Sequence, residues 1–253
     1  MRAGDTSARV DDNTGFHWDR SSRMVLADAL VRLGPNRCGT EIRPDEVLLT
    51  EPPTRRERVG AALLECGAAL STIWTVVRVL GREPLVTFPG DPAPPDVAAV
   101  VRAGDARGTS SGEWARYAAL RKLGEPDRGT VQRPVSLAVL GALAADDFWP
   151  DTTVRIVRPD WVSTLEHLGA DVTGDSSLLI TTPEDSRRHR VLAGAALHAT
   201  RLAAASRGFS SRVLPMRSPA ERTHHVEKSP LPGIPQAVLL VGFATPKRRN
   251  PRR

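Results

Sequence analysis

A short motif occurs twice in the chain, and its repetition limits the folds that the sequence can adopt. The tetrapeptide GAAL occupies 67–70 and again 194–197, and Gly81 and Gly208 follow fourteen residues after the first glycine of each copy. Each copy lies between two short apolar segments, the first of which ends in Thr and a nearby proline. Self-similarity of this kind is typical of a repeated structural unit. We expect two diverged strand–helix–strand units; the alternative is that two alanine-rich core helices are alike by chance.

The segment around the first copy is the clearest helix in the sequence. Apolar residues recur at steps of three and four from Val59 to Leu80, and Gly81 then ends the pattern. A capping box, 54–57 (TRRE), precedes it. Gly67 is unfavourable inside a helix, so we expect it and the following alanines to form a small-residue patch against which another helix packs closely.

The remaining patterns predict an α+β chain with two halves that form one core. The expected strands are 46–50, 85–88, 153–158, 177–182, 212–214 and 236–243. The expected helices are 24–33, 95–103, 113–123 (capping box 110–113), 136–146 (N-cap Ser136), 160–169, 185–207 and a short one from Ser218. Residues 1–20 are polar and are expected to form a disordered tail, followed by halves at 21–130 and 131–253.

Composition narrows the classes of function. The net charge is +6, but Arg and Lys form a dense cluster only at the C-terminus, and no nucleic-acid-binding motif is recognised, so a nucleic-acid partner is not favoured. No apolar run of the length that spans a bilayer is recognised, and no signal peptide, so we expect a cytoplasmic protein without a membrane partner. The two cysteines, Cys38 and Cys66, make neither a disulfide framework nor a metal site by spacing, and Cys66 reads as a small core residue.

Four segments together resemble the nitroreductase superfamily, and specifically its Acg-like branch found in actinobacteria. They are 63–81 (LLECGAALSTIWTVVRVLG), 95–101, 193–209 (AGAALHATRLAAASRGF) and 232–246 (PGIPQAVLLVGFATP). The resemblance implies a nitroreductase-like fold in which two halves of one chain form an intramolecular pseudo-dimer around central antiparallel or mixed sheets. It also implies an FMN at the interface of the halves, which carries hydride from NAD(P)H to a small-molecule electron acceptor. The flavin supplies that chemistry, so no catalytic acid, base or nucleophile is expected.

The resemblance places the border of the flavin ring in the loop that follows the first helix. Pro35 and Thr40 match the family's first flavin loop, and Asn36 offers a polar contact there. The family's Asn and Gln amides, which bind the ring in relatives, correspond to Gly39 and Glu41. A carboxylate only accepts hydrogen bonds and would repel a reduced, anionic flavin.

The same resemblance assigns the FMN phosphate to arginines. The family's arginine motif is reduced to Arg128-Gly129, and its C-terminal Pro-Arg-Arg reappears with Arg252 and Arg253. Guanidinium groups bind phosphate well. The alternatives are a surface ion pair for Arg128 and a solvated basic tail for the last two. Relatives also carry a lid that corresponds here to the short turn 169–177.

Other candidate sites are less well supported by the sequence. Adjacent histidines, His224 and His225, would point to different faces of a helix, and no third ligand is suitably spaced, so no metal site is expected. His198 is expected to be a core or interface histidine. Four tryptophans could stack on an aromatic ligand, although core packing is the favoured interpretation for each: Trp74, Trp114, Trp149 and Trp161.

The sequence thus predicts an FMN-binding, NAD(P)H-dependent oxidoreductase that acts as a monomeric pseudo-dimer. The alternative is a catalytically degenerate protein of the same fold that sequesters flavin or binds another protein. The departures from the family pattern at 36–43 and 124–128, together with the missing lid, keep both hypotheses open.

Overall fold

The chain folds into two antiparallel β-sheets with helices between and beside them, which confirms the predicted α+β class. The computed structural model describes residues 16–34, 38–51, 59–89, 96–123, 131–172, 176–214, 216 and 231–244. Below, the first half means the described residues up to 123, and the second half means those from 131 onward.

The elements of the first half begin with an N-terminal helix and end with a helix that leads toward the second half. They are α1 (Arg20–Val31), β1 (Gly39–Ile42), β2 (Glu46–Thr50), α2 (Val59–Val79), β3 (Arg82–Thr87), β4 (Val97–Ala106) and α3 (Ser111–Leu123).

The second half follows a similar sequence of elements, with one extra strand at its start, an extra helix between its second and third strands, and no described helix after its last strand. They are β5 (Val131–Pro134), α4 (Leu137–Ala145), β6 (Thr153–Ile156), α5 (Pro159–His167), β7 (Ser177–Thr182), α6 (Arg187–Ser206), β8 (Ser210–Leu214) and β9 (Ile234–Ala244).

The two sheets have the same strand order. The first sheet runs β1-β2-β4-β3, and every neighbouring pair is antiparallel. The second contains the corresponding antiparallel path β6-β7-β9-β8, with β5 also paired to β9. In both halves a strand, a long helix and two further strands follow one another along the chain. The repeat seen in the sequence is therefore matched by repeated strand pairing.

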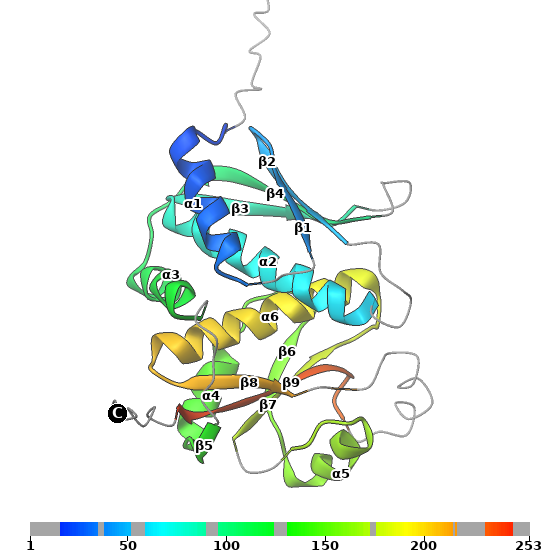
Figure 1. Cartoon of the computed structure of the whole chain (residues 1–253). Coiled ribbons are helices and arrows are strands. Elements are labelled where there is room, and N and C mark those ends of the chain that lie inside the picture. Colours follow the sequence, from blue (N-terminus) through cyan, green and yellow to red (C-terminus); the bar gives the residue numbers. More distant parts are fainter. Residues whose placement is uncertain are drawn as a thin grey trace, which may run out of the picture.

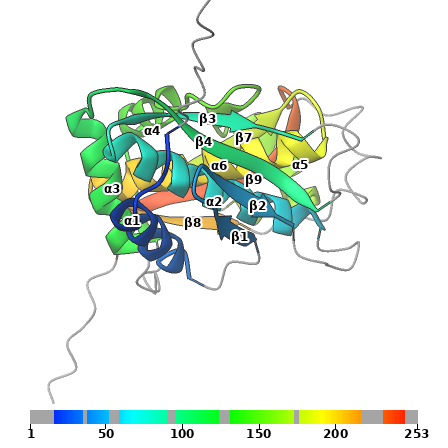
Figure 2. The ribbon, with the colours of Figure 1, turned by 90° about the horizontal axis from the view of Figure 1, so that it is seen from above.

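The two long helices lie between the sheets. Figure 1 shows α2 and α6 side by side at the centre, with the first sheet on one side and the second sheet on the other. Seen from above, the strands of the first sheet lie across the helix pair, and the second sheet lies beneath it (Figure 2). Apolar residues of both sheets and both helices belong to one continuous core.

The helices meet at the glycines of the repeated motif. A Cβ atom added to Gly67 would overlap the carbonyl oxygen of Val191, and one added to Gly194 would overlap the backbone of Leu64. The close approach is possible only because both positions lack a side chain. The prediction that another helix packs closely against the patch at Gly67 is confirmed, and the partner is the second copy of the motif.

Helix α2 is more apolar than the sequence reading allowed. Its segment Ala61–Val79 has the length and hydropathy of a membrane span, contrary to the expectation that no such run is present. Most of the segment is buried inside the fold, against α6 and the first sheet. Burial of this kind is typical of the central helix of a packed core.

One predicted helix is wrong. The segment assigned to a helix at 95–103 is strand β4, which pairs with β2 on one side and β3 on the other. Its valines are β-branched and favour an extended chain, and from Ala99 onward one face of the strand is buried while the other is more exposed. In the sequence, however, 97–101 (VAAVV) is apolar at every position, and such a short run carries little periodicity to separate a strand from a helix.

The ends of several elements also differ from expectation. Helix α1 begins at Arg20, four residues before the expected start, because the Asp19 side chain caps it and accepts from the Ser22 N–H at 2.6 Å. Trp18, in the segment expected to be a disordered tail, is buried in the core. Strands β1 and β5 were not predicted.

The helix caps that the sequence indicated are present where they are described. The Glu113 N–H donates to Ser110 Oγ at 3.2 Å, and the Ser110 N–H donates back to Glu113 Oε2 at 2.7 Å. Ser136 caps α4 as predicted. The capping box at 54–57 and the short helix from 218 lie outside the described residues.

Candidate functional site

The structure describes two of the eight residues assigned to the flavin site. Thr40 and Glu41 lie on β1. The other six lie outside the described residues: Pro35, Asn36, Arg128, Gly129, Arg252 and Arg253. Their assignment therefore stays a prediction.

Glu41 lies at the protein surface, where it forms an ion pair with Arg43, the residue that follows β1. Strand β1 is at the edge of the first sheet, and both Thr40 and Glu41 are exposed. The Arg43 guanidinium donates to both carboxylate oxygens, with Nε to Oε1 at 3.0 Å and Nη2 to Oε2 at 3.2 Å. This hydrogen bonding lowers the pKa of Glu41. Both oxygens of the Glu41 carboxylate thus accept hydrogen bonds from Arg43.

Thr40 lines a cavity that belongs to the first half alone. The cavity has a volume of about 410 Å³ and lies between α1 and β1. It is lined by Ala27, Leu30, Val31, Gly34, Cys38, Thr40 and Ile42. All of them come from a single stretch of chain, so this cavity is not at the boundary between the halves.

A second cavity does lie at that boundary, and its walls are largely aromatic. Its volume is about 260 Å³. Helix α2 and the region of β3 contribute from the first half, and the connection between α4 and β6 together with α6 contributes from the second. The lining residues are Trp74, Pro84, Val86, Phe88, Phe148, Trp149, Pro150, Arg188 and Leu192. We call it the aromatic cavity.

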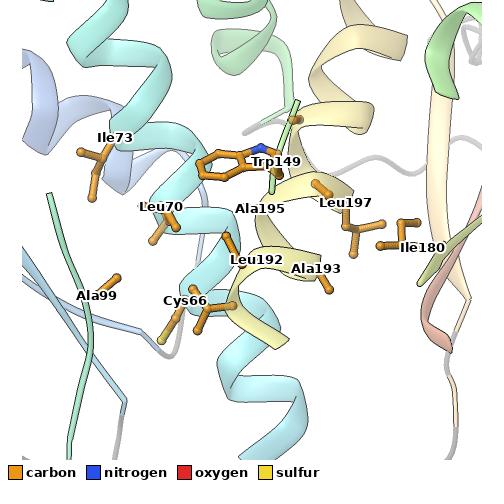
Figure 3. Close-up of a cluster of buried hydrophobic side chains, with 14 of the residues drawn as sticks. Cys66, Leu70, Ile73, Ala99, Trp149, Ile180, Leu192, Ala193, Ala195 and Leu197 are labelled. Carbon is orange, nitrogen blue, oxygen red and sulfur yellow. The ribbon is translucent and has the colours of Figure 1, made fainter. Parts of the chain in front are cut away.

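Three rings form one continuous wall of the aromatic cavity. The Phe148 ring centroid lies 4.5 Å from that of Trp74 and 5.3 Å from that of Trp149. Phe148 is 41% exposed, whereas Trp149 is only 6% exposed. Figure 3 shows the Trp149 indole beside α2 and α6, above the packed side chains of the core. The wall is thus anchored by a buried indole and presents an accessible ring to solvent.

A tight turn positions Phe148 and Trp149. The Asp147 carboxylate accepts from the Trp149 N–H at 3.3 Å and from Thr152 Oγ1 at 2.9 Å. Burial raises the pKa of Asp147, although these hydrogen bonds favour the ionised form and partly offset the effect. Asp151 closes the turn with φ +56°, a left-handed conformation that Asp tolerates better than most residues.

Arg188 is the cation of the aromatic cavity. Its Nη1 lies 2.7 Å from Asp151 Oδ2, and its guanidinium carbon lies 5.4 Å from the centroid of Phe88. The side chain is 41% exposed. Because Asp151 neutralises much of its charge, Arg188 offers an anion a moderate attraction rather than a strong one.

The connection that carries Phe148 and Trp149 corresponds to the loop predicted to border the flavin. In the first half that loop joins α1 to β1, and in the second half 146–152 joins α4 to β6. The sequence-based prediction considered only the loop of the first copy, and it missed Phe88 in the first half as well as Phe148 and Arg188 in the second. A usable signal was the pair of adjacent aromatics in a chain with only five Trp, five Phe and one Tyr, of which four line this cavity.

The tryptophans divide between core and surface. Trp149 and Trp161 are buried, as the favoured interpretation expected. Trp74 is half-buried and faces the aromatic cavity. For Trp114 the core prediction is wrong, because 51% of the residue is exposed on α3, where its ring lies edge-on to Tyr117.

Two buried polar clusters have structural roles. Arg78, 1% exposed, donates to Glu113 at 2.6 Å and to Glu83 at 3.1 Å, and so ties α2 to β3 and α3. His198 on α6 lies 3.2 Å from Thr72 Oγ1 on α2, which confirms it as an interface histidine. Desolvation by burial, with the nearby Arg201 charge, lowers the pKa of His198 to about 3.

Within the described residues, no three His, Cys, Asp or Glu side chains form a group that could hold a metal ion. His224 and His225 lie outside these residues. No family model matches the chain, and no curated protein matches it.

Proposed function

We propose that the protein is a nitroreductase-like, FMN-binding oxidoreductase that uses NAD(P)H, built as an intramolecular pseudo-dimer. The observation that carries the proposal is the aromatic cavity at the boundary between two halves with the same strand order. The resemblance implies a flavin at such a boundary. We place the ring there rather than beside Thr40, whose cavity is formed by the first half alone.

The residues of the aromatic cavity fit a flavin ring in shape and chemistry. Aromatic side chains stack on planar ring systems, and the accessible Phe148 is supported from behind by Trp149. The volume of about 260 Å³ is at the small end for a ligand site, so it suits the ring system while the ribityl phosphate extends outward. Arg188 would hold the phosphate. When bound, FMN would supply hydride transfer between the nicotinamide and a small-molecule acceptor.

Two assignments of the phosphate site compete. The family resemblance assigns the phosphate to Arg128 with Arg252 or Arg253, whereas a flavin ring in the aromatic cavity would bring the phosphate to Arg188. Alanine variants separate them, because only the residue that contacts the phosphate should affect FMN more than riboflavin, which lacks the phosphate. If Arg128 is the ligand, its loss should weaken FMN binding by at least about tenfold, the value of a charge-assisted hydrogen bond.

A second candidate function is binding without catalysis. It is favoured by the Glu41–Arg43 pair, which replaces an amide of the family site with a satisfied carboxylate. It is also favoured by the Arg188–Asp151 pair, since a partly neutralised arginine binds phosphate less well. In this version the protein sequesters flavin, or binds another protein, in the cytoplasm. Neither version requires a membrane or a nucleic acid.

The first experiment is visible absorbance of the purified protein, followed by titration with FMN and with riboflavin. Binding is followed by quenching of tryptophan fluorescence, because Trp74 and Trp149 line the cavity. A flavin spectrum or micromolar binding of both flavins supports the proposal. A colourless protein whose fluorescence does not respond to either flavin overturns it.

Variants locate the ring. Phe148→Ala should weaken FMN and riboflavin alike by about five- to thirtyfold, from the roughly 1–2 kcal/mol of a stacked ring. Trp114→Ala is the matched control, because it removes an exposed aromatic ring that does not line the cavity and should change neither affinity. Equal effects of the two variants would remove the assignment to the aromatic cavity.

Reduction separates the two candidate functions once binding is shown. Bleaching of the bound FMN by NADH or NADPH under anaerobic conditions, followed by reoxidation with a quinone or nitroaromatic acceptor, identifies an oxidoreductase. Bound FMN that neither nucleotide reduces identifies the sequestering protein.

A further inference from the structure

The two cysteines of the chain meet in the core, although their spacing in the sequence indicated no pairing. Gly39 of β1 is the ladder partner of Thr50 of β2, and Cys38 immediately precedes Gly39. From α2, Cys66 Sγ donates to the carbonyl oxygen of Thr50 at 3.8 Å. The Cys38 thiol donates to the carbonyl oxygen of Gly39 at 3.5 Å, so the two side chains reach the same rung of the sheet.

We propose that Cys38 and Cys66 are a reversible redox pair, which a hydroperoxide oxidises to an intramolecular disulfide. Neither cysteine is in a disulfide, and both are buried in the same hydrophobic cluster. Figure 3 shows Cys66 on the side of α2 that faces the strand carrying Ala99, away from the contact with α6. Joining the two sulfurs would therefore link α2 to the start of β1 without disturbing the helix pair.

The oxidant has a route to one of the two thiols. Cys38 lines the cavity of about 410 Å³ between α1 and β1, whereas no atom of Cys66 is accessible. A small peroxide that enters this cavity meets Cys38 first. Cys66 is then the resolving thiol, because its sulfur lies at the same Gly39–Thr50 rung as that of Cys38.

The reaction balances in two steps. The Cys38 sulfur attacks the peroxide ROOH and takes one oxygen, which gives Cys38–SOH and the alcohol ROH. The Cys66 sulfur then attacks the sulfenic sulfur, the S–S bond forms, and the oxygen leaves as water with the two remaining protons. The two thiols lose two electrons in total and the peroxide gains them. A dithiol reductant restores both thiols by exchange.

The environment makes this a slow reaction. The hydrogen bond with Cys66, together with burial, raises the pKa of Cys38, so its thiol stays protonated at neutral pH. The thiolate is the reactive form. The pair is therefore expected to respond to sustained peroxide rather than to turn over rapidly, and this distinguishes it from a peroxidase site.

The test treats the reduced, full-length protein with excess hydrogen peroxide and follows it by intact mass and by thiol titration in denaturant. We expect both thiols to disappear together, the mass to fall by two hydrogen atoms, and a dithiol to reverse the change. The thermal midpoint should rise by roughly 5–10 °C, because the bond closes a long loop between the two cysteines. Proteolysis should yield one cross-linked peptide pair.

Single-cysteine variants check the order of events. In Cys66→Ala the reaction should stop at a sulfenic acid on Cys38 that dimedone traps, whereas Cys38→Ala should keep its buried Cys66 thiol under the same treatment. The proposal is overturned if the folded wild-type protein keeps both thiols. It is also overturned if it accumulates dimedone-reactive sulfenic acid without a cross-link.

Discussion

Replacing Gly67 by alanine tests the central contact of the fold. The new methyl group would overlap the carbonyl oxygen of Val191 and approach the backbone N of Ala195. Both are backbone atoms of the partner helix, so no rotamer change can make room. The helices must separate, and every side chain along their contact loses part of its packing.

Two opposing effects set the size of the loss. Alanine is favoured over glycine in a helix interior by about 1 kcal/mol, which would stabilise the variant. Against this, forcing extra volume into a packed core costs about 1–3 kcal/mol, and more when backbone must move. A separation of about 1 Å also forfeits a quarter to a half of the contact energy of the atoms involved. We expect a net decrease of about 2–3 kcal/mol in the free energy of unfolding.

Urea denaturation followed by circular dichroism measures this difference as a lower midpoint at an unchanged slope. The matched control is Gly141→Ala in α4, where an added Cβ meets nothing within 4 Å. That variant should be as stable as the wild type or up to about 1 kcal/mol more stable. If Gly67→Ala behaves like Gly141→Ala, the helices do not approach as closely as described, and the reasoning fails.

Three further predictions concern charged and titrating groups. Burial opposes ionisation of Glu113, but hydrogen bonds from Arg78 and Ser110 outweigh it and lower its pKa to about 2. The contribution of the Glu113 carboxylate to the free energy of unfolding should be present above pH ~4.5 and lost as the pH falls toward 2. In urea titrations, Glu113→Gln should therefore lower the free energy of unfolding by about 2–3 kcal/mol at pH 7 and weaken its decrease at acid pH. The pKa of His198 is about 3 in the folded protein, so the unfolded chain takes up the proton at a higher pH than the folded protein does. The free energy of unfolding should therefore fall as the pH drops below about 6.5, by at most about 1.4 kcal/mol per pH unit. His198→Gln should remove this pH dependence. Asp151→Asn should free Arg188 and strengthen FMN binding by a few-fold in fluorescence titrations, while riboflavin binding stays the same.

The sequence predicted the repeated part of the fold well because local signals and packing agree there. The spacing of the two GAAL segments indicated paired units, and Gly67 indicated the close helix contact. Helix ends were predictable where a side chain caps the first turn, as at Ser110 and Ser136. These signals are short in range and depend on few residues.

The errors arose where long-range packing decides the structure. Strand β4 begins with five consecutive apolar residues, 97–101, so the sequence shows no alternation there that would separate it from a helix. The edge strand β1 is polar and short, and it forms because β2 lies beside it. Neither feature can be recognised without knowing which strands are neighbours.

The candidate site was less predictable than the fold. The residues carried over from the family are mostly outside the described part, and Glu41 is engaged by Arg43. The aromatic cavity joins residues more than a hundred positions apart, such as Trp74 and Leu192, so no local pattern points to it. No local pattern points to the meeting of the two cysteines either, because it depends on the pairing of β1 with β2.

The helix pair has a consequence for how the chain unfolds. Each sheet covers one side of α2 and α6, and the residues at the contact between the helices are almost wholly buried. Either half on its own would therefore expose a large apolar surface to water. Separating the halves would expose the centre of the core rather than the surface of a domain. The two sheets should therefore melt in one cooperative transition, and the boundary near residue 130 divides the chain into repeats without dividing it into independent folding units.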